Sequence, residues 1–205
     1  MSRKHAWNRT RNSERKVAVK NILPKILIVS EGEKTEPLYF DGFRVPTVDL
    51  KIVPGSRIHV SVVRLAMRLK NKTAYDEVWC VFDRDKNPKN RRDLEQFNEA
   101  IRLAKANKIK IAYSNDAFEL WYLLHFTYMK SAIGRHDYIT KLNKYLIKKY
   151  EKNDPEMYDI LEDRMDIAIR NARRLFDYYD KENPAHNDPC TTVFKLVERL
   201  KEFSR

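Results

Sequence analysis

The feature that most constrains the fold is a short apolar run that ends abruptly in polar residues. Residues 26–29, Ile-Leu-Ile-Val, have the pattern of a strand buried on both faces, which is typical of parallel sheets. Ser30 and Glu31 follow at once, and Gly32 then lets the backbone turn. Glu31 is therefore expected at the carboxyl end of a buried strand, the edge where open α/β sheets bind ligands. A surface glutamate that only stabilises the start of the next helix would give the same local pattern.

Strands and helices are predicted to alternate along the first part of the chain. Apolar runs predict four strands, at about 25–30, 50–53, 77–82 and 109–113. Helical spacing of apolar residues predicts the intervening helices at about 36–43, 57–71, 93–107 and 118–126. Ser56 is placed to cap the second of these helices. Such alternation implies an α/β fold with a mainly parallel four-stranded sheet flanked by helices.

The rest of the chain is predicted to be helical. No further strand is evident, and helices are expected near 137–151, 155–180 and 191–203. We therefore divide the chain into a basic N-terminal arm (1–24), an α/β core (25–130) and a C-terminal helical region (131–205) that packs on the core.

The net charge of +12 indicates a polyanionic partner, and nucleic acid is the commonest one. The excess is concentrated in the first 25 residues, where eight Lys or Arg residues accompany Glu14 as the single acid. Within this arm Arg9, Arg11 and Arg15 are candidate contacts to nucleic-acid phosphates. A solvated, poorly ordered terminus would have the same composition.

Several classes of protein are disfavoured by the sequence. No apolar run approaches the roughly 20 residues of a membrane helix, and the N-terminus lacks the apolar segment of a secretion signal. Two cysteines do not suggest a disulfide framework, so a cytoplasmic protein without a membrane partner is expected. The phosphate-binding loop of ATPases is missing, the histidines lack zinc-site spacing, and His125 is expected in the core.

Three acidic residues are predicted to lie at the ends of two buried strands. Glu31 follows the first strand, and Asp83 and Asp85 follow the third with a spacing that can aim both carboxylates at one site. Mg²⁺ or Mn²⁺ prefers such oxygen ligands and keeps water molecules that phosphate oxygens can replace. Glu119, at the start of the helix after the fourth strand, is a candidate fourth catalytic carboxylate, and Asn115 could orient a ligand. Glu119 could equally serve only the helix N-terminus.

Basic residues follow the acidic ones closely. They are the candidate nucleic-acid-binding residues Lys34, Lys86, Lys89, Arg91 and Arg92. Cations beside a metal site suit phosphate oxygens and the charge that develops in phosphoryl transfer. A solvated loop would also be rich in these residues.

The sequence resembles the Toprim domain, the metal-binding α/β module of topoisomerases, primases and several nucleases. The matching pieces are residues 28–32 (Ile-Val-Ser-Glu-Gly) and 81–85 (Val-Phe-Asp-Arg-Asp). More narrowly, most of the chain after the arm is similar to the RloB family of Toprim-like proteins. That resemblance also includes residues 33–37 (Glu-Lys-Thr-Glu-Pro), 114–121 (Ser-Asn-Asp-Ala-Phe-Glu-Leu-Trp) and 191–193 (Thr-Thr-Val). The departure from the usual Toprim pattern is Ser30, which stands between the apolar run and Glu31.

The resemblance implies a Toprim-like core and a role in bacterial defence against phage by abortive infection. It also implies a partner ATPase of the ABC or OLD type, encoded by a neighbouring gene, and a homo-oligomer is among the expectations. Related Toprim effectors are metal-dependent nucleases. In such an enzyme, with Mg²⁺ as the expected metal, Glu31 would be a ligand or general base and Asp83 and Asp85 would hold the metal.

Two other functions stay open. A Toprim-like subunit could bind nucleic acid or the ATPase without cutting. A phosphohydrolase of the haloacid-dehalogenase type also uses Asp-x-Asp, but places it on the first strand of its core, whereas here it follows the third. A topoisomerase is disfavoured because 205 residues leave little room for strand-passage domains. The sequence does not distinguish DNA from RNA as the substrate.

Overall fold

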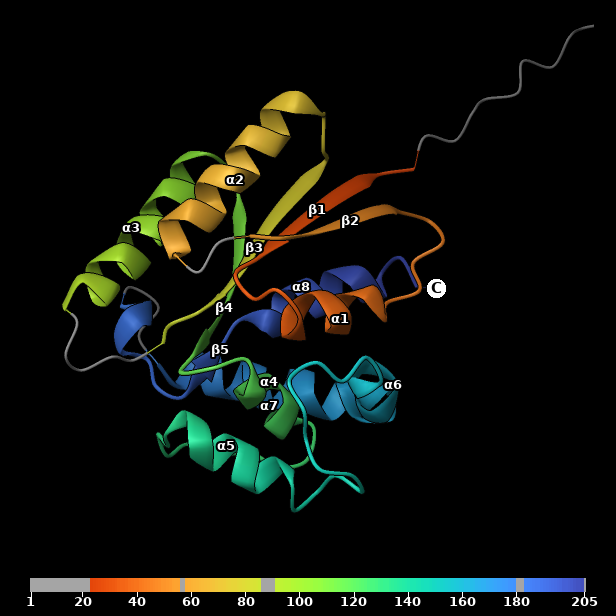
Figure 1. Cartoon of the computed structure of the whole chain (residues 1–205), viewed down its shortest axis with the longest axis vertical. Helices are drawn as coiled ribbons and strands as arrows, with labels where there is room; N and C mark the ends of the chain where they lie inside the picture. The colour runs from red at the N-terminus through yellow and green to blue at the C-terminus, as the bar shows by residue number, and fades with distance from the viewer. Residues whose placement is uncertain (1–22, 56–57, 86–90, 180–182, 205) are drawn as a thin grey trace, which may run out of the picture.

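The computed structural model describes residues 23–55, 58–85, 91–179 and 183–204. Its centre is a five-stranded sheet with the order β2-β1-β3-β4-β5 (Figure 1). The strands are β1 (Lys25–Ser30), β2 (Asp49–Pro54), β3 (Glu77–Asp83), β4 (Lys110–Asn115) and β5 (Cys190–Thr191). β1 to β4 are parallel, and β5 pairs antiparallel with β4. The predicted α/β class and mainly parallel sheet are therefore confirmed.

Helices cover both faces of the sheet (Figure 1). On one face lie α2 (His59–Lys72) and α3 (Arg91–Ala106). On the other face lie α1 (Thr35–Asp41), α4 (Glu119–Leu124) and α8 (Val193–Lys201). The remaining helices extend this second layer: α5 (Arg135–Leu142), α6 (Met157–Leu161), the short 3-10 turn η1 (Glu162–Arg164) and α7 (Met165–Tyr178). A second 3-10 turn, η2 (Pro184–His186), precedes β5.

The alternation of side chains along β1 explains why the sheet is covered on both sides. Ile26 and Ile28 belong to the core beneath α1, α4, α7 and α8, whereas Leu27 and Val29 belong to the core beneath α2 and α3. All four side chains are fully buried. When a strand is buried on both faces, every apolar side chain along it is removed from water and stabilises the fold. A continuous apolar run is therefore favoured at such a strand.

The fifth strand corrects the expectation of four strands and of a purely helical C-terminal region. Thr191 pairs with Ser114, and Cys190 pairs with Asn115. The Oγ1 atom of Thr192 accepts a hydrogen bond from the backbone N–H of Tyr113 at 2.9 Å. Residues 190–192 thus satisfy the free edge of β4 and fix the C-terminal segment beside the sheet.

Two predicted helices also differ from the structure. The helix expected near 137–151 ends at Leu142, because the Asn143 side chain accepts a hydrogen bond from the backbone N–H of Tyr150 at 2.7 Å and holds the intervening residues as a loop. The helix expected over 155–180 is divided into α6, η1 and α7. The capping role predicted for Ser56 falls outside the described residues.

The remaining expectations concern the cysteines, His125 and membrane-spanning helices. Cys80 and Cys190 are buried free thiols, and His125 is fully buried, with its Nδ1 atom 2.9 Å from the Trp121 carbonyl oxygen. Among the described helices, none combines the length and apolar character that crossing a membrane requires.

Candidate functional site

The site begins where β1 and β3 end side by side. Chain connections leave these neighbouring strands toward opposite faces of the sheet, since α1, which follows β1, packs on one face and α3, which follows β3, packs on the other. Such a switch point opens a crevice at the carboxyl ends of the strands. Ser30 is the last residue of β1, so Glu31 follows the strand directly despite the serine. The backbone N–H of Glu31 donates to the Val81 carbonyl at 2.8 Å, and that of Asp83 donates to Glu31 Oε2 at 3.3 Å.

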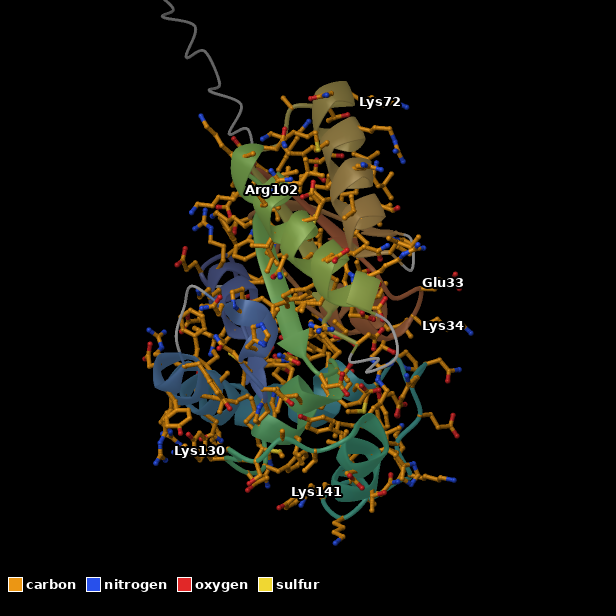
Figure 2. All side chains as sticks on the ribbon, turned by 90° about the vertical axis from the view of Figure 1, so that its left-hand side faces the viewer. Glu33, Lys34, Lys72, Arg102, Lys130 and Lys141 are labelled. Atoms are coloured by element: carbon orange, nitrogen blue, oxygen red, sulfur yellow. The ribbon has the colours of Figure 1, made fainter. Side chains whose placement is uncertain are left out.

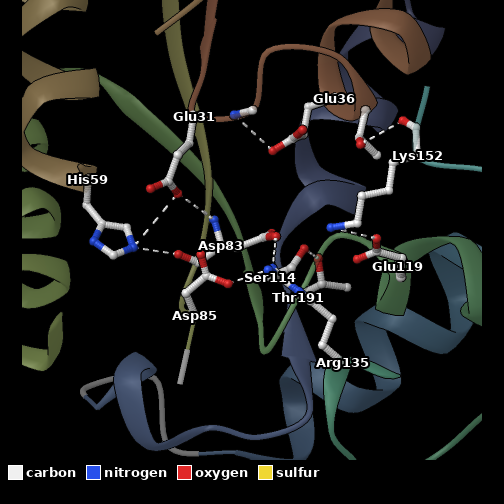
Figure 3. Close-up of polar contacts among 12 residues, drawn as sticks. Glu31, Glu36, His59, Asp83, Asp85, Ser114, Glu119, Arg135, Lys152 and Thr191 are labelled. Atoms are coloured by element: carbon white, nitrogen blue, oxygen red, sulfur yellow. Dashed lines mark hydrogen bonds and ion pairs between the residues drawn. The ribbon is translucent and has the colours of Figure 1, made fainter. Parts of the chain in front are cut away.

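Gly32 leaves room for the buried carboxylate of Glu36. The Gly32 N–H donates to Glu36 Oε1 at 3.3 Å. A Cβ atom at position 32 would lie 2.0 Å from Glu36 Oε2, so any larger residue would push the Glu36 side chain away. Glu36, which is buried, is thereby held at the floor of the crevice near Glu31 and Asp83 (Figure 3).

The Asp-x-Asp segment directs its two carboxylates into the crevice. The Asp83 side chain is 13% exposed and that of Asp85 is 50% exposed. Arg84 lies on the opposite side, 5.8 Å from the centre of the Phe97 ring. Asp85 has a φ of 38°, in the left-handed region that aspartate tolerates better than most residues.

Arg135, at the first position of α5, binds both aspartates. Its Nη2 atom lies 2.9 Å from Asp83 Oδ2 and 2.6 Å from Asp85 Oδ1 (Figure 3). This residue was not predicted from the sequence, since it lies in a segment without a recognisable motif and 52 positions beyond Asp83.

Glu119 forms the inner wall of the same crevice. Its side chain is 3% exposed, accepts a hydrogen bond from the Tyr150 hydroxyl at 3.2 Å, and lies 3.7 Å from Lys152 Nζ. Tyr150 and Lys152 come from the loop after α5, so the C-terminal region supplies part of the wall. Asn115 does not face this crevice: it is fully buried and donates to the Asn187 carbonyl at 2.7 Å.

His59, the first residue of α2, is a second site residue that was not predicted from the sequence. Its Nε2 atom lies 2.6 Å from the Asp83 carbonyl oxygen and 3.9 Å from Glu31 Oε2. A carbonyl oxygen only accepts hydrogen bonds, so Nε2 must carry the proton. Burial lowers the pKa of His59, which keeps the ring neutral and makes it a positioning group for the Asp-x-Asp backbone. Its place at a helix start was visible in the sequence, but its partner was not.

The acidic residues destabilise one another's charges. Burial raises the pKa of Glu31 to about 8, and the nearby Asp85 carboxylate adds to the shift. Burial also raises the pKa of Asp83 well above its ordinary value, with Glu36 contributing. The pKa of Glu36 is raised by burial and, to a smaller extent, by Glu119. The pKa of about 8 means that Glu31 is largely protonated at pH 7 in the metal-free protein, and the raised pKa values of Asp83 and Glu36 favour their neutral forms unless a cation balances the charge.

Together these groups line a pocket of about 520 Å³. It contains all four predicted catalytic residues, Glu31, Asp83, Asp85 and Glu119, together with Glu36 and Arg135. Lys34 lies at its rim and extends toward solvent (Figure 2). An acidic floor with basic groups around it suits a divalent cation and a phosphate bound together.

The other predicted nucleic-acid-binding residues lie elsewhere or outside the described residues. Arg92 is exposed in the first turn of α3 and does not line the pocket. Arg91 begins α3. Arg9, Arg11, Arg15, Lys86 and Lys89, with nearly all of the basic arm, fall outside the described residues.

The donor set fits a hard cation chemically, but it is not assembled into one coordination sphere. Within the described residues, no group of three or more His, Cys, Asp or Glu side chains has the geometry of a metal site. Asp83 Oδ1 is nevertheless buried without a hydrogen-bond partner, and burial together with neighbouring carboxylates raises the pKa values of Glu31 and Asp83. Arg135 supplies part of that charge.

A family model described as RloB-like protein matches residues 26–200, which is most of the chain. No curated protein and no solved structure matches the chain.

Proposed function

The chain belongs to the RloB-like protein family, and from that premise we propose that it is a Toprim-like nuclease that uses Mg²⁺ or Mn²⁺ to cleave phosphodiester bonds in DNA or RNA. We further propose that it acts in bacterial defence against phage together with a partner ATPase. The defence role and the partner come from the family resemblance.

One observation carries the proposal for the site. Glu31 and Asp83 leave adjacent parallel strands at the switch point of the sheet, and a hydrogen bond of 3.3 Å joins Glu31 Oε2 to the Asp83 backbone. Asp85 and Glu119 line the same pocket. Purely structural carboxylates are normally paired so that they ionise easily, whereas a raised pKa in a cleft is typical of a functional site.

The proposed roles follow from position. Asp83 and Asp85 would hold the cation, with Glu31 as a third ligand or as the general base. A bound divalent cation would polarise the scissile phosphate and lower the pKa of a water molecule. The pKa of about 8 suits Glu31 to accept a proton from water near neutral pH. His59 would position Asp83 through its backbone carbonyl, and Lys34 would bind phosphate at the rim.

A cleavage assay tests the proposal. Plasmid, single-stranded DNA and tRNA are incubated with the protein in Mg²⁺ or in excess chelator, with and without the proposed ATPase partner. Cleavage of at least one substrate that requires the metal supports a nuclease. Cleavage that survives the chelator would contradict the metal-dependent mechanism.

A non-catalytic binding subunit is the second candidate, and Arg135 is the observation that favours it. A guanidinium group already bridges Asp83 and Asp85, as it would in a protein that has replaced a metal by a side chain. Tight binding of nucleic acid or of the ATPase, without cleavage in any metal, would support this candidate instead.

A further inference from the structure

Arg135 occupies the position at which the proposed function needs a metal ion. One guanidinium nitrogen, Nη2, lies 2.9 Å from an oxygen of Asp83 and 2.6 Å from an oxygen of Asp85. These carboxylates are the same ones that would hold a divalent cation. Because a guanidinium and a divalent cation repel each other, metal binding would weaken the contacts of Arg135 with these carboxylates.

The guanidinium group is incompletely satisfied in its present position. The Nε atom of Arg135 is buried without a hydrogen-bond partner, and so is Oδ1 of Asp83. Burial alone would lower the pKa of Arg135, but Asp83 and Asp85 raise it, so the side chain stays charged. The contact is therefore an ion pair in which the Nε–H donor of Arg135 is unused. A second position of the guanidinium group that offers more hydrogen-bond acceptors can compete with it.

The surroundings of Arg135 allow its side chain to move. Its side chain is 37% exposed, and it follows Gly134, where an added Cβ would meet only Asp137 Oδ2, at 3.7 Å. The helix α5 lies at the outside of the molecule, beyond α4 (Figure 1). The exposed part of the Arg135 side chain gives the guanidinium room to shift within the pocket.

The displaced side chain would still face the pocket, which Arg135 lines. Arginine presents parallel N–H donors that match two oxygens of one phosphate, and this geometry is the strongest that a side chain offers to a phosphodiester. Lys152, from the loop after α5, also lines this pocket and lies against Glu119 (Figure 3).

We propose that Arg135 is a phosphate-binding residue of this site, which rests on Asp83 and Asp85 in the metal-free protein and turns to the phosphodiester when a divalent cation takes those carboxylates. The inference rests on the proposed function, because it assumes the metal and the phosphate. It assigns to the C-terminal helical region a direct part in substrate binding and makes metal binding the event that releases the arginine.

The test compares wild type with Arg135→Gln, Arg135→Lys and the control Arg102→Gln. Arg102 is exposed on α3, pairs with Glu99 and does not line the pocket (Figure 2). Binding of Mn²⁺ alone is measured by calorimetry, and binding of a short fluorescent oligonucleotide by anisotropy in Mn²⁺. Circular dichroism checks that each variant is folded.

The two readouts should move in opposite directions. Arg135→Gln removes the competing cation, so the affinity for Mn²⁺ should rise about tenfold. The same variant lacks the phosphate ligand, so the affinity for the oligonucleotide should fall about tenfold. Arg135→Lys keeps the charge but not the paired donors, so its Mn²⁺ affinity should stay near that of wild type while oligonucleotide binding weakens. Arg102→Gln should change neither.

Unchanged or weaker Mn²⁺ binding by Arg135→Gln would overturn the proposal, and so would unchanged oligonucleotide binding. If Arg135→Gln does not fold, Arg135→Lys decides, because equal oligonucleotide binding by that variant would also overturn it. The Mn²⁺ titration needs no cleavage: opposite shifts in a protein that never cuts would support Arg135 while contradicting the nuclease. A wild-type protein that binds no Mn²⁺ would contradict both.

Discussion

The backbone N–H of Asp83 donates a hydrogen bond to Oε2 of Glu31 at 3.3 Å, which ties the end of β3 to the residue that follows β1. The contact brings the two acidic segments together although 52 positions separate them. Both segments line the crevice between β1 and β3, the two neighbouring strands whose connections run to opposite faces of the sheet. The site is thus a consequence of strand order, and its charge, the proposed metal and the supporting packing can each be tested.

The metal-free protein should lose stability as the pH rises from about 4.5 to about 8. The pKa of Glu31 is raised from 4.5 to about 8, so across this interval the folded state holds a proton that the unfolded state has released. The loss should be a few kcal/mol at most, at about 1.4 kcal/mol for each pH unit. Thermal melts in chelator at several pH values measure it.

The matched variants are Glu31→Gln and Glu99→Gln. The first removes the titrating carboxyl of Glu31 and should make the decline shallower, whereas the second changes a glutamate on α3 outside the pocket and should leave the decline in place. If stability rises over the same pH interval, or if Glu31→Gln leaves the decline unaltered, the pKa of Glu31 is not raised in the folded protein.

Mn²⁺ should raise the thermal stability of the wild type. Ligand binding to the folded state alone stabilises it by about 2.7 kcal/mol at a hundredfold excess over Kd, or roughly 5 to 10 °C for a chain of this size. Differential scanning fluorimetry in Mn²⁺ measures the shift. Asp83→Asn should remove most of it, while Asp166→Asn, which changes an exposed residue on α7, should retain it. Equal shifts in the two variants would argue against metal binding at Asp83.

Gly42→Ala should destabilise the fold by about 2 kcal/mol through overpacking. A Cβ atom at position 42 would lie 2.4 Å from the Cβ and Cγ atoms of Tyr158, which join α6 to the C-terminal end of α1. Gly134→Ala is the control, since open space surrounds that position apart from Asp137. Urea denaturation measures both. A Gly42→Ala protein as stable as Gly134→Ala would mean that α6 does not pack closely on α1.

Deletion of residues 1–20 should weaken nucleic-acid binding and make its salt dependence shallower. The deleted segment holds most of the basic excess of the arm, and the logarithmic salt slope should fall by about 0.9 for each phosphate that the arm neutralises. Filter binding at several salt concentrations measures both quantities. An unchanged affinity and slope would assign the arm to another partner or to none.

The sheet and the acidic residues were predictable because they depend on local patterns. A continuous apolar run of four residues defines β1 without knowledge of its neighbours, and the acidic residues at strand ends follow from the order of residues alone. Parallel strands then bring Glu31 and Asp83 to one edge by geometry.

The remaining parts depend on contacts between distant segments. β5 has only two residues, and its pairing is fixed by hydrogen bonds of Thr191 and Thr192 with Tyr113 rather than by its own composition. Arg135, His59 and Lys152 reach the site from α5, α2 and the loop after α5, none of which carries a motif. A basic residue on an amphipathic helix looks the same in sequence whether it faces solvent or a carboxylate.

The most direct test is the cleavage rate of wild type, Glu31→Gln and Asp83→Asn on one nucleic-acid substrate in Mg²⁺, with the proposed ATPase partner included. Both substitutions keep side-chain size and remove one carboxylate, so the basic surface is unchanged. The rate should fall on the order of a thousandfold or more in each variant, since a catalytic metal supplies several kcal/mol of transition-state stabilisation. Asp83→Asn should lose Mn²⁺ binding as well. Cleavage at the wild-type rate by Asp83→Asn, or in excess chelator, would contradict the metal-dependent nuclease.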